Sequence, residues 1–168
     1  MNLKLTEDTF RCGVPLVLLL IAAIALGIAY AVELVYELKP CTLCLYQRVP
    51  FAVLGLLGIA AYIFNSDKSL MLLACGAGLV LLISAGLASY HIGVEQHWWT
   101  SVASCGVDSE GQVLTMSQFQ ALIRQKPEIA CDEIIWSLFG FSMATYNAFV
   151  SLILGIIALW AANRLRTP

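Results

Sequence analysis

Four of the six cysteines fall into two pairs whose spacing suits redox chemistry. Cys41 and Cys44 form a Cys-X-X-Cys motif at the start of an apolar run, and Cys105 and Cys131 bracket the long polar segment of the chain. Two sulfurs at Cys-X-X-Cys spacing can close a disulfide with little backbone rearrangement, and a helix N-terminus favours the thiolate. A thiolate attacks disulfides and quinones, so the pair indicates thiol redox work. A passive disulfide or a metal site is the alternative interpretation.

Three polar residues are candidates to support this chemistry. Arg48 follows Cys44 by one helical turn, so its guanidinium can lie near that sulfur. His91 and Glu95 are also one turn apart, near the end of an apolar run, and can face each other. Titratable residues at that depth are functional candidates. A proton donor there would serve quinone reduction, whereas the competing interpretation is an interfacial histidine bonded to loop backbone.

The second cysteine pair has a structural alternative. A Cys105–Cys131 disulfide would enclose 25 residues, a closure that stabilises by roughly 3–4 kcal/mol in the chain-entropy treatment. A loop clamp is therefore possible, but beside the first pair we favour a disulfide that meets a soluble partner and relays to Cys41. Cys12 and Cys75 lie within apolar runs, and we expect them to pack as small apolar residues.

The composition places these cysteines in a membrane protein. The 168 residues are 60% hydrophobic and 12% charged, against about 45–50% apolar and about 25% charged in soluble domains. Stretches without Asp, Glu, Lys or Arg that are long enough to span a bilayer are Cys12–Val32, Val49–Ser66, Ser69–Val94 and Ile134–Asn163. We expect one all-α domain, 1–168, with membrane helices at about 14–35, 45–64, 70–92 and 142–162 and outer loops at about 36–44 and 93–141.

The charges orient this four-helix bundle. With four spans, both termini share a side with the turn at 65–69, and basic residues near the span ends favour that side as cytoplasmic. The cysteines of both pairs then face outward, which in a bacterium is the periplasm, where disulfides persist. Cleavage of a signal peptide after Ala31 is a weaker alternative, because the apolar run is longer than usual.

Other polar and aromatic residues of the outer side are expected to play interfacial roles. Glu33 and Glu37 should be solvated at the interface, and Trp98 and Trp99 should anchor the membrane–water boundary. The long periplasmic loop should carry a short amphipathic helix that ends at Arg124. This helix lies either on the membrane surface or against its own loop.

Several segments resemble the DsbB family of membrane disulfide-bond formation proteins. The first is Pro-Cys-Thr-Leu-Cys-Leu-Tyr-Gln-Arg-Val-Pro at 40–50. The others are Ser-Tyr-His-Ile-Gly-Val-Glu at 89–95, Cys-Asp-Glu at 131–133, and Trp136 followed by Phe-Gly-Phe-Ser-Met-Ala at 139–144 and Asn147. The resemblance covers nearly the whole chain, and its Cys-X-X-Cys-X-X-Gln-Arg element is fairly specific.

The resemblance implies a thiol:quinone oxidoreductase of the bacterial inner membrane. Cys105 would be attacked by a reduced DsbA-like periplasmic oxidase, and Cys131 would pass electrons to Cys41–Cys44. Cys44 would react with a quinone, with ubiquinone expected and menaquinone as the alternative, while Arg48 would hold the quinone oxygen. His91 and Glu95 would be quinone neighbours, and no resident metal is expected.

Other functions remain open at this point. A vitamin K epoxide reductase-like enzyme uses the same four-helix, two-dithiol logic, although Gln47-Arg48 favours DsbB. A tetraspanin-like scaffold with a disulfide-clamped loop would need neither Cys41 nor Cys44 for thiol exchange. A Cys₄ metal site built from the four outer cysteines is the third alternative.

Overall fold

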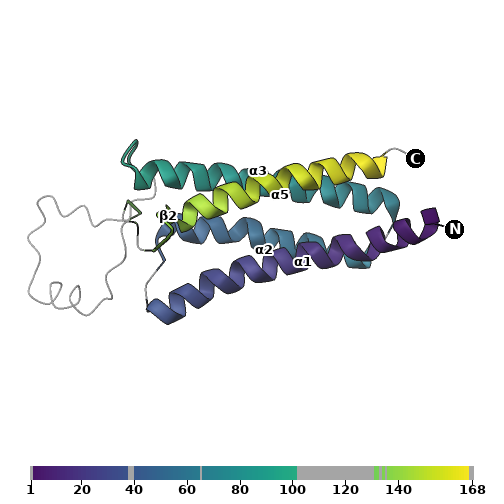
Figure 1. Ribbon diagram of the computed structural model, residues 1–168, viewed down its shortest axis with the longest axis horizontal. Helices are drawn as coiled ribbons and strands as arrows, with labels where there is room; N and C mark the ends of the chain where they lie inside the picture. Colours follow the sequence, from purple (N-terminus) through teal and green to yellow (C-terminus); the bar gives the residue numbers. More distant parts are fainter. Residues whose placement is uncertain are drawn as a thin grey trace, which may run out of the picture.

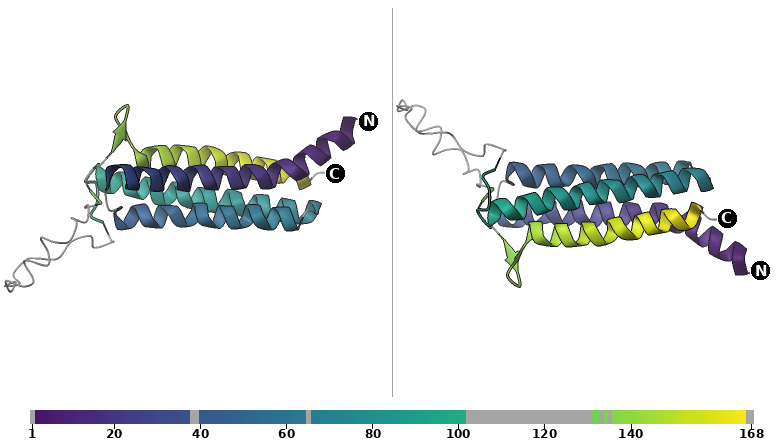
Figure 2. Two further views of the ribbon diagram at one scale, coloured as in Figure 1. Left: turned by 90° about the horizontal axis from the view of Figure 1, so that it is seen from below. Right: turned by 90° about the horizontal axis from the view of Figure 1, so that it is seen from above.

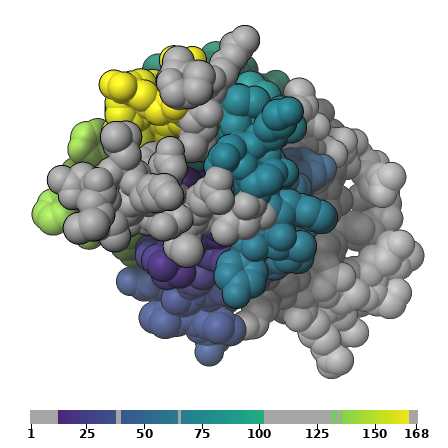
Figure 3. Space-filling model, turned by 90° about the vertical axis from the view of Figure 1, so that its right-hand side faces the viewer, coloured from purple at the N-terminus to yellow at the C-terminus, as the bar shows by residue number. Residues whose placement is uncertain are grey.

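Long helices packed side by side make up most of the chain (Figure 1). The structure, a computed structural model, describes residues 2–37, 40–64, 66–101, 131–132, 134 and 136–166, with side chains between 13 and 164. Its elements are α1 (Asn2–Tyr36), α2 (Thr42–Ile63), α3 (Asp67–Glu95), β1 (Ser137–Leu138), β2 (Phe141–Ser142) and α5 (Met143–Arg166). The chain termini lie at the same end of the bundle (Figure 1), which Figure 3 shows end-on with the last turns of α5 in yellow.

Each long helix can cross a membrane by its length and composition. The apolar spans are Gly13–Tyr36, Thr42–Ile63, Asp67–Glu95 and Met143–Arg164. Large apolar side chains such as Ile24, Leu56, Leu72 and Ile153 are exposed on the outside of the bundle, which in water would be unfavourable and in lipid is not. The predicted all-α membrane four-helix bundle is confirmed for the part of the chain that the structure describes.

Small residues set the closest helix contacts. α3 packs most extensively on α5, and α1 packs on α2. At Gly78 of α3, an added Cβ would lie 2.7 Å from Leu159 and 3.2 Å from the carbonyl oxygen of Gly155 in α5. Glycines allow such close backbone approach, which supplies packing contacts between helices in lipid. α1 and α5 scarcely touch each other, so the bundle is open along one side.

Two helices begin earlier than predicted because a side chain caps each. The Cys41 sulfur accepts from the Cys44 N–H at 3.3 Å and starts α2 at Thr42. Ser66 accepts from the Ser69 N–H at 3.3 Å and starts α3 at Asp67. Each cap satisfies one of the N–H groups that a helix start leaves without a partner.

α1 is the helix whose length departs most from the prediction. It begins at Asn2, well before the predicted start near residue 14, and its first turns bend away from the bundle (Figure 2). Pro15 lies inside α1 and supplies a physical cause of the bend, because proline removes a backbone hydrogen bond and its ring clashes with the preceding turn.

A short hairpin that was not predicted leads into α5. Ser137 pairs with Ser142 and Leu138 with Phe141 in an antiparallel register. The two turn residues, Phe139 and Gly140, have φ of 52° and 82°, as a two-residue hairpin turn with both φ positive requires. The predicted amphipathic helix of the long loop lies outside the described residues, as does Cys105.

Candidate active site

The Cys-X-X-Cys pair lies at the N-terminus of α2, with both cysteines in the thiol state. Cys41 is almost fully buried, whereas Cys44 is half-buried. The thiol of Cys41 donates to the sulfur of Cys44, and the two sulfurs are 3.0 Å apart. The Cys44 N–H in turn donates to the Cys41 sulfur. The helix start therefore holds the two sulfurs close enough to form a disulfide after a small shift.

The two sulfurs are not equivalent. The hydrogen bond to Cys44, together with burial, raises the pKa of the Cys41 thiol to about 12. Cys41 therefore retains its proton at neutral pH, and negative charge on the pair falls on Cys44. Since the thiolate is the nucleophile, Cys44 is the sulfur equipped to attack.

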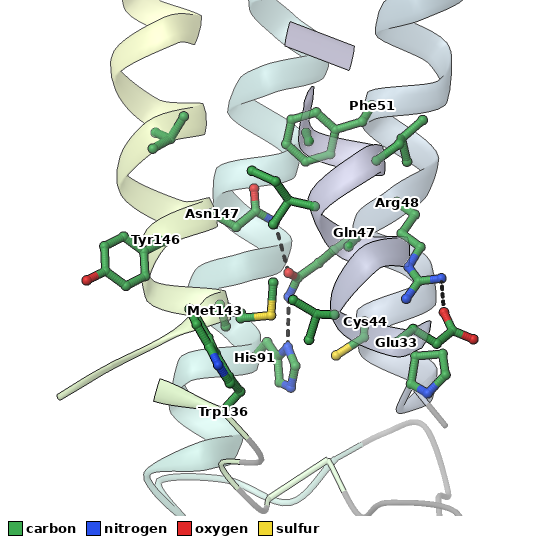
Figure 4. A pocket seen from close by; sticks show the side chains of 18 of the residues that line it. Glu33, Cys44, Gln47, Arg48, Phe51, His91, Trp136, Met143, Tyr146 and Asn147 are labelled. Atoms are coloured by element: carbon green, nitrogen blue, oxygen red, sulfur yellow. Dashed lines mark hydrogen bonds and ion pairs between the residues drawn. The ribbon is translucent and has the colours of Figure 1, made fainter. Parts of the chain in front are cut away.

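His91 of α3 lies over the buried side of the pair. Its Nε2 is 3.7 Å from the Cys41 sulfur and 3.9 Å from Oε1 of Glu95. Its Nδ1 is 2.8 Å from Nε2 of Gln47, one turn into α2 (Figure 4). An amide nitrogen can only donate, so Nδ1 accepts and the neutral ring carries its proton on Nε2. The ring therefore presents a proton to the sulfur side of the site.

A chain of polar side chains continues from His91 between α2, α3 and α5. Asn147 Nδ2 donates to Gln47 Oε1 at 2.9 Å (Figure 4), and Ser151 donates to Asn147 Oδ1 at 2.8 Å. Ser84 lies 3.3 Å from Ser151 and is fully buried like it. Each amide both donates and accepts, and among the described residues every buried side-chain nitrogen or oxygen has a partner. Polar groups at this depth need such partners, so the chain fixes the position of Gln47.

Glu95 is tied to the start of α5. Its side chain is 7% exposed, and Ser142 donates to its Oε2 at 2.5 Å. Ser142 also accepts from the Thr145 N–H at 3.3 Å, which caps the first turn of α5. The carboxylate beside His91 is thus bound to Ser142, the last residue of β2 and the residue that caps α5.

Residues of α1 anchor Arg48. Its Nη1 donates to Oε2 of Glu33 at 2.7 Å (Figure 4), and its guanidinium lies 4.6 Å from the ring centre of Tyr30. Glu33 was predicted to be a solvated interfacial group; its side chain is 32% exposed, and it is also paired with Arg48, which reaches across from α2. A charged side chain at the membrane boundary is tolerated when a group of opposite charge binds it.

These groups surround one end of a cavity of about 510 Å³. Apolar side chains of α1 and α5 form most of its wall, including Ile21, Ile24, Ile28, Val150 and Leu154. Its polar end holds Cys44, Gln47, Arg48, His91 and Glu95, with Trp136 and Met143 beside them (Figure 4). Because α1 and α5 scarcely touch and the cavity-lining side chains of Ile24, Ile28 and Val150 are about half exposed, the cavity opens at the side of the bundle, which in a membrane faces lipid.

The structure places most of the predicted site residues together. Cys131 is buried in one apolar cluster with Cys41, Leu43 and Val94, and Cys44 packs against it. Cys41, Cys44, Arg48, His91 and Glu95 all line the cavity. Trp98 and Trp99 are exposed near the end of α3, and Trp99 stacks on Tyr90 with ring centres 5.8 Å apart.

Sequence reasoning assigned no positioning role to the residues that hold the site in place, although Gln47, Ser142 and Asn147 lie in the segments that carry the resemblance. These residues are Tyr30, Glu33, Gln47, Ser84, Ser142, Asn147 and Ser151. One usable signal was the spacing of Asn147 and Ser151, four residues apart in an apolar run. Polar residues inside a membrane span face the bundle interior. The second signal was Gln47, three residues after Cys44 and so on the same helix face.

The fold and the site define a class: a four-helix membrane protein with a Cys-X-X-Cys dithiol beside a cavity at the side of the bundle. A family model described as disulfide bond formation protein DsbB matches residues 11–161. The chain belongs to this family, which gives it an oxidoreductase role in disulfide bond formation.

Individual relatives match over most of the chain. A disulfide bond formation protein B of Xylella fastidiosa is 31% identical over 137 residues, 79% of each chain. One of Acinetobacter baumannii is 28% identical over 153 residues, 87% of this chain and 88% of its own. An uncharacterized protein of Rickettsia prowazekii, RP370, is 29% identical over 141 residues, 83% of this chain and 80% of its own. No solved structure gives a significant match.

Proposed function

We propose that this protein oxidises a periplasmic thioredoxin-like dithiol protein of the DsbA type and transfers the electrons to a membrane quinone. The observation that carries the proposal is the position of Cys44, a nucleophilic sulfur at the polar end of an apolar cavity that opens to lipid. A volume of about 510 Å³ is within the range of small-molecule sites, about 300–1,000 Å³. The apolar wall suits a ring with an isoprenoid tail, and the polar end suits its oxygens.

The electron and proton counts balance for this pair of substrates. Two thiols that close a disulfide release two electrons and two protons, and a quinone takes up two of each to become a quinol. Cys44 lines the cavity, so its sulfur passes the electron pair to the substrate. The sulfur of Cys41 then bonds to that of Cys44, and the Cys41 S–H bond breaks.

His91 is positioned to transfer one of the two protons. Its Nε2–H can be given to the substrate oxygen, and the proton that leaves Cys41, 3.7 Å away, can replace it. In the arrangement that the structure shows, the Gln47 amide donates to Nδ1 at 2.8 Å, so Nε2 carries the proton that exchanges. Positioned proton transfer of this kind contributes about 10²–10⁴ to a rate. Arg48 offers a cation at the cavity wall for the developing negative charge on the substrate oxygen.

The outer cysteines would deliver the electrons. The burial of Cys131 in the cluster that contains Cys41 supports a relay in which Cys131 exchanges with the Cys41–Cys44 disulfide. Cys105 would then be the sulfur that the soluble partner attacks. A DsbA-type oxidase has a potential of about −120 mV, so its reoxidation needs an acceptor of higher potential. A respiratory quinone, dissolved in the membrane that the cavity faces, meets that need.

The proposal includes an orientation in the bacterial inner membrane. The redox site lies at the end of the bundle opposite the chain termini (Figure 1). With the termini cytoplasmic, as the basic residues near the span ends favour, the thiols face the oxidising periplasm.

Steady-state turnover tests the function. Purified protein in detergent is mixed with a reduced DsbA-type protein and with a ubiquinone or a menaquinone analogue, and quinone absorbance is followed. We expect consumption that requires the dithiol protein and is abolished by Cys44→Ala, while Cys75→Ala, a matched cysteine variant outside the site, behaves like the parent. Full turnover by Cys44→Ala, or none by the parent with either quinone, would refute the proposal.

A further inference from the structure

The reduced dithiol and His91 form a cluster with the composition of a soft-metal site. The sulfurs of Cys41 and Cys44 and one ring nitrogen of His91 lie within 4.8 Å of one another. Cys41 is 1% exposed and His91 4% exposed, so two of the three groups are already withdrawn from water. Thiolate with imidazole selects Zn²⁺ and Cu⁺ over hard cations such as Mg²⁺ and Ca²⁺. We propose that Cys41, Cys44 and His91 bind one Zn²⁺ when the dithiol is reduced, and that this blocks its oxidation.

The distance between Cys41 and His91 agrees with tetrahedral zinc, and the distance between the two sulfurs requires a small shift. Zn–S bonds of about 2.3 Å and Zn–N bonds of about 2.0–2.1 Å at a tetrahedral angle separate sulfur from nitrogen by about 3.6 Å, and the Cys41 sulfur is 3.7 Å from His91 Nε2. The same geometry separates two sulfurs by about 3.8 Å, whereas they are 3.0 Å apart here. Cys44 must therefore move by somewhat under 1 Å, and it borders the cavity, where there is space for this shift.

The balance of charge favours binding at this depth. Two thiols lose two protons as Zn²⁺ binds, so the thiolates and the metal sum to zero charge. A neutral cluster avoids most of the cost of placing an ion in a low-dielectric interior. Three protein ligands leave one position open towards the cavity, as in zinc sites that are not fully enclosed.

Gln47 supplies the support that a ligating histidine needs. For Nε2 to bind the metal, the ring proton must move to Nδ1, where a hydrogen-bond acceptor should receive it. The Gln47 amide already contacts Nδ1 at 2.8 Å, and a half-turn brings its oxygen to that position. Asn147, which pairs with the other end of that amide, can make the same half-turn. The amide chain therefore accommodates either ring tautomer.

Binding should depend on the redox state. A Cys41–Cys44 disulfide has no thiolate to offer, so oxidised protein loses two ligands of three. Conversely, sulfurs bound to zinc cannot bond to each other until the metal leaves. Bound zinc would therefore inhibit oxidation of the dithiol, and this inhibition does not depend on which electron acceptor is used.

Direct metal binding is the first test. Detergent-solubilised protein carrying Cys105→Ser, which removes the outer dithiol, is reduced with a phosphine and titrated with Zn²⁺ against a chromophoric chelator. We expect one Zn²⁺ per reduced chain and none per oxidised chain. Co²⁺ in place of Zn²⁺ should show tetrahedral d–d bands with thiolate charge transfer. Equal binding by the oxidised protein, or no binding by the reduced protein, would overturn the proposal.

The chain offers matched controls for the ligands. His91→Gln should weaken zinc binding at least as much as the loss of a hydrogen-bond partner of a ligating histidine does, which is about 10–100-fold. His97→Gln, at the only other histidine, should not change it. Cys41→Ser should weaken binding, and Cys75→Ala should not. His91→Cys, which restores a soft third ligand, should recover affinity, which separates lost ligation from misfolding. Unchanged affinity in His91→Gln would show that a different set of groups holds the metal.

Inhibition of dithiol oxidation by zinc is tested with a small oxidant that needs no quinone site. Diamide should oxidise the Cys41–Cys44 dithiol rapidly, Zn²⁺ should slow this at least tenfold, and EDTA should restore the rate. Because no quinone is present, this result stands or falls independently of the proposed function. If zinc binds but does not slow oxidation by diamide, the proposed inhibition of dithiol oxidation is wrong.

Discussion

Replacing Gln47 by leucine tests whether the proton position on His91 matters. Leucine keeps much of the volume but removes the contact with His91 Nδ1 at 2.8 Å and that with Asn147 Nδ2 at 2.9 Å. A neutral hydrogen bond in a protein contributes about 0.5–1.5 kcal/mol. If the energy of the first contact orients the ring only in the transition state, losing it slows quinone reduction by about 2- to 13-fold. We expect this loss in kcat, with little change in the quinone KM.

The assay is steady-state quinone reduction over a range of pH, with Tyr46→Leu as the neighbouring control. Tyr46 is 54% exposed on the outside of α2, so its replacement should leave kcat unchanged. Gln47→Glu makes the test sharper, because a carboxylate can still accept from Asn147 but cannot donate to Nδ1. The ring proton should then move to Nδ1, and both kcat and its pH profile should change. A Gln47→Leu protein with the parent's kcat and pH profile would refute the positioning role.

Further variants probe the dithiol, the cavity and the packing. Since a hydrogen bond to Cys44 raises the pKa of Cys41 to about 12, Cys44→Ser should lower the pKa of Cys41 and speed its alkylation at pH 8; an unchanged alkylation rate would contradict this cause. Arg48→Ala should raise the quinone KM, and Glu33→Gln, which keeps a weaker partner 2.7 Å from the guanidinium, should raise it less; unchanged quinone kinetics in both would exclude Arg48 from the binding site. Gly78→Val should lower the free energy of unfolding by about 1–3 kcal/mol, because even a Cβ would lie 2.7 Å from α5; thermal melts in detergent check this.

The membrane spans and the shared helix faces could be predicted because each depends on residues that are close together in the sequence. Uninterrupted apolar runs are a property of composition, so they located the spans that the structure contains. Cys44 and Arg48, like His91 and Glu95, are one helical turn apart, so their shared faces follow from helix geometry alone. The turn at Phe139-Gly140 escaped prediction because a non-glycine residue takes a positive φ there.

The parts that sequence did not predict are contacts between distant segments. Gln47 is 44 residues from His91 and 100 from Asn147, so their hydrogen bonds depend on how α2, α3 and α5 pack. Arg48 and Glu33 are 15 residues apart on different helices, and no helical spacing rule connects them. A polar side chain inside a membrane span can be predicted to need a partner. Which residue is the partner depends on how the helices pack.

A single-turnover experiment tests the central claim most directly. Protein carrying Cys105→Ser is fully reduced and freed of reductant, then mixed with excess ubiquinone analogue, and both quinone absorbance and the thiols of Cys41 and Cys44 are followed. The account predicts one quinone reduced per chain, with formation of a Cys41–Cys44 disulfide, identified by peptide mass, at the same rate. Disulfide formation without quinol, or quinol formed while both thiols persist, would contradict it.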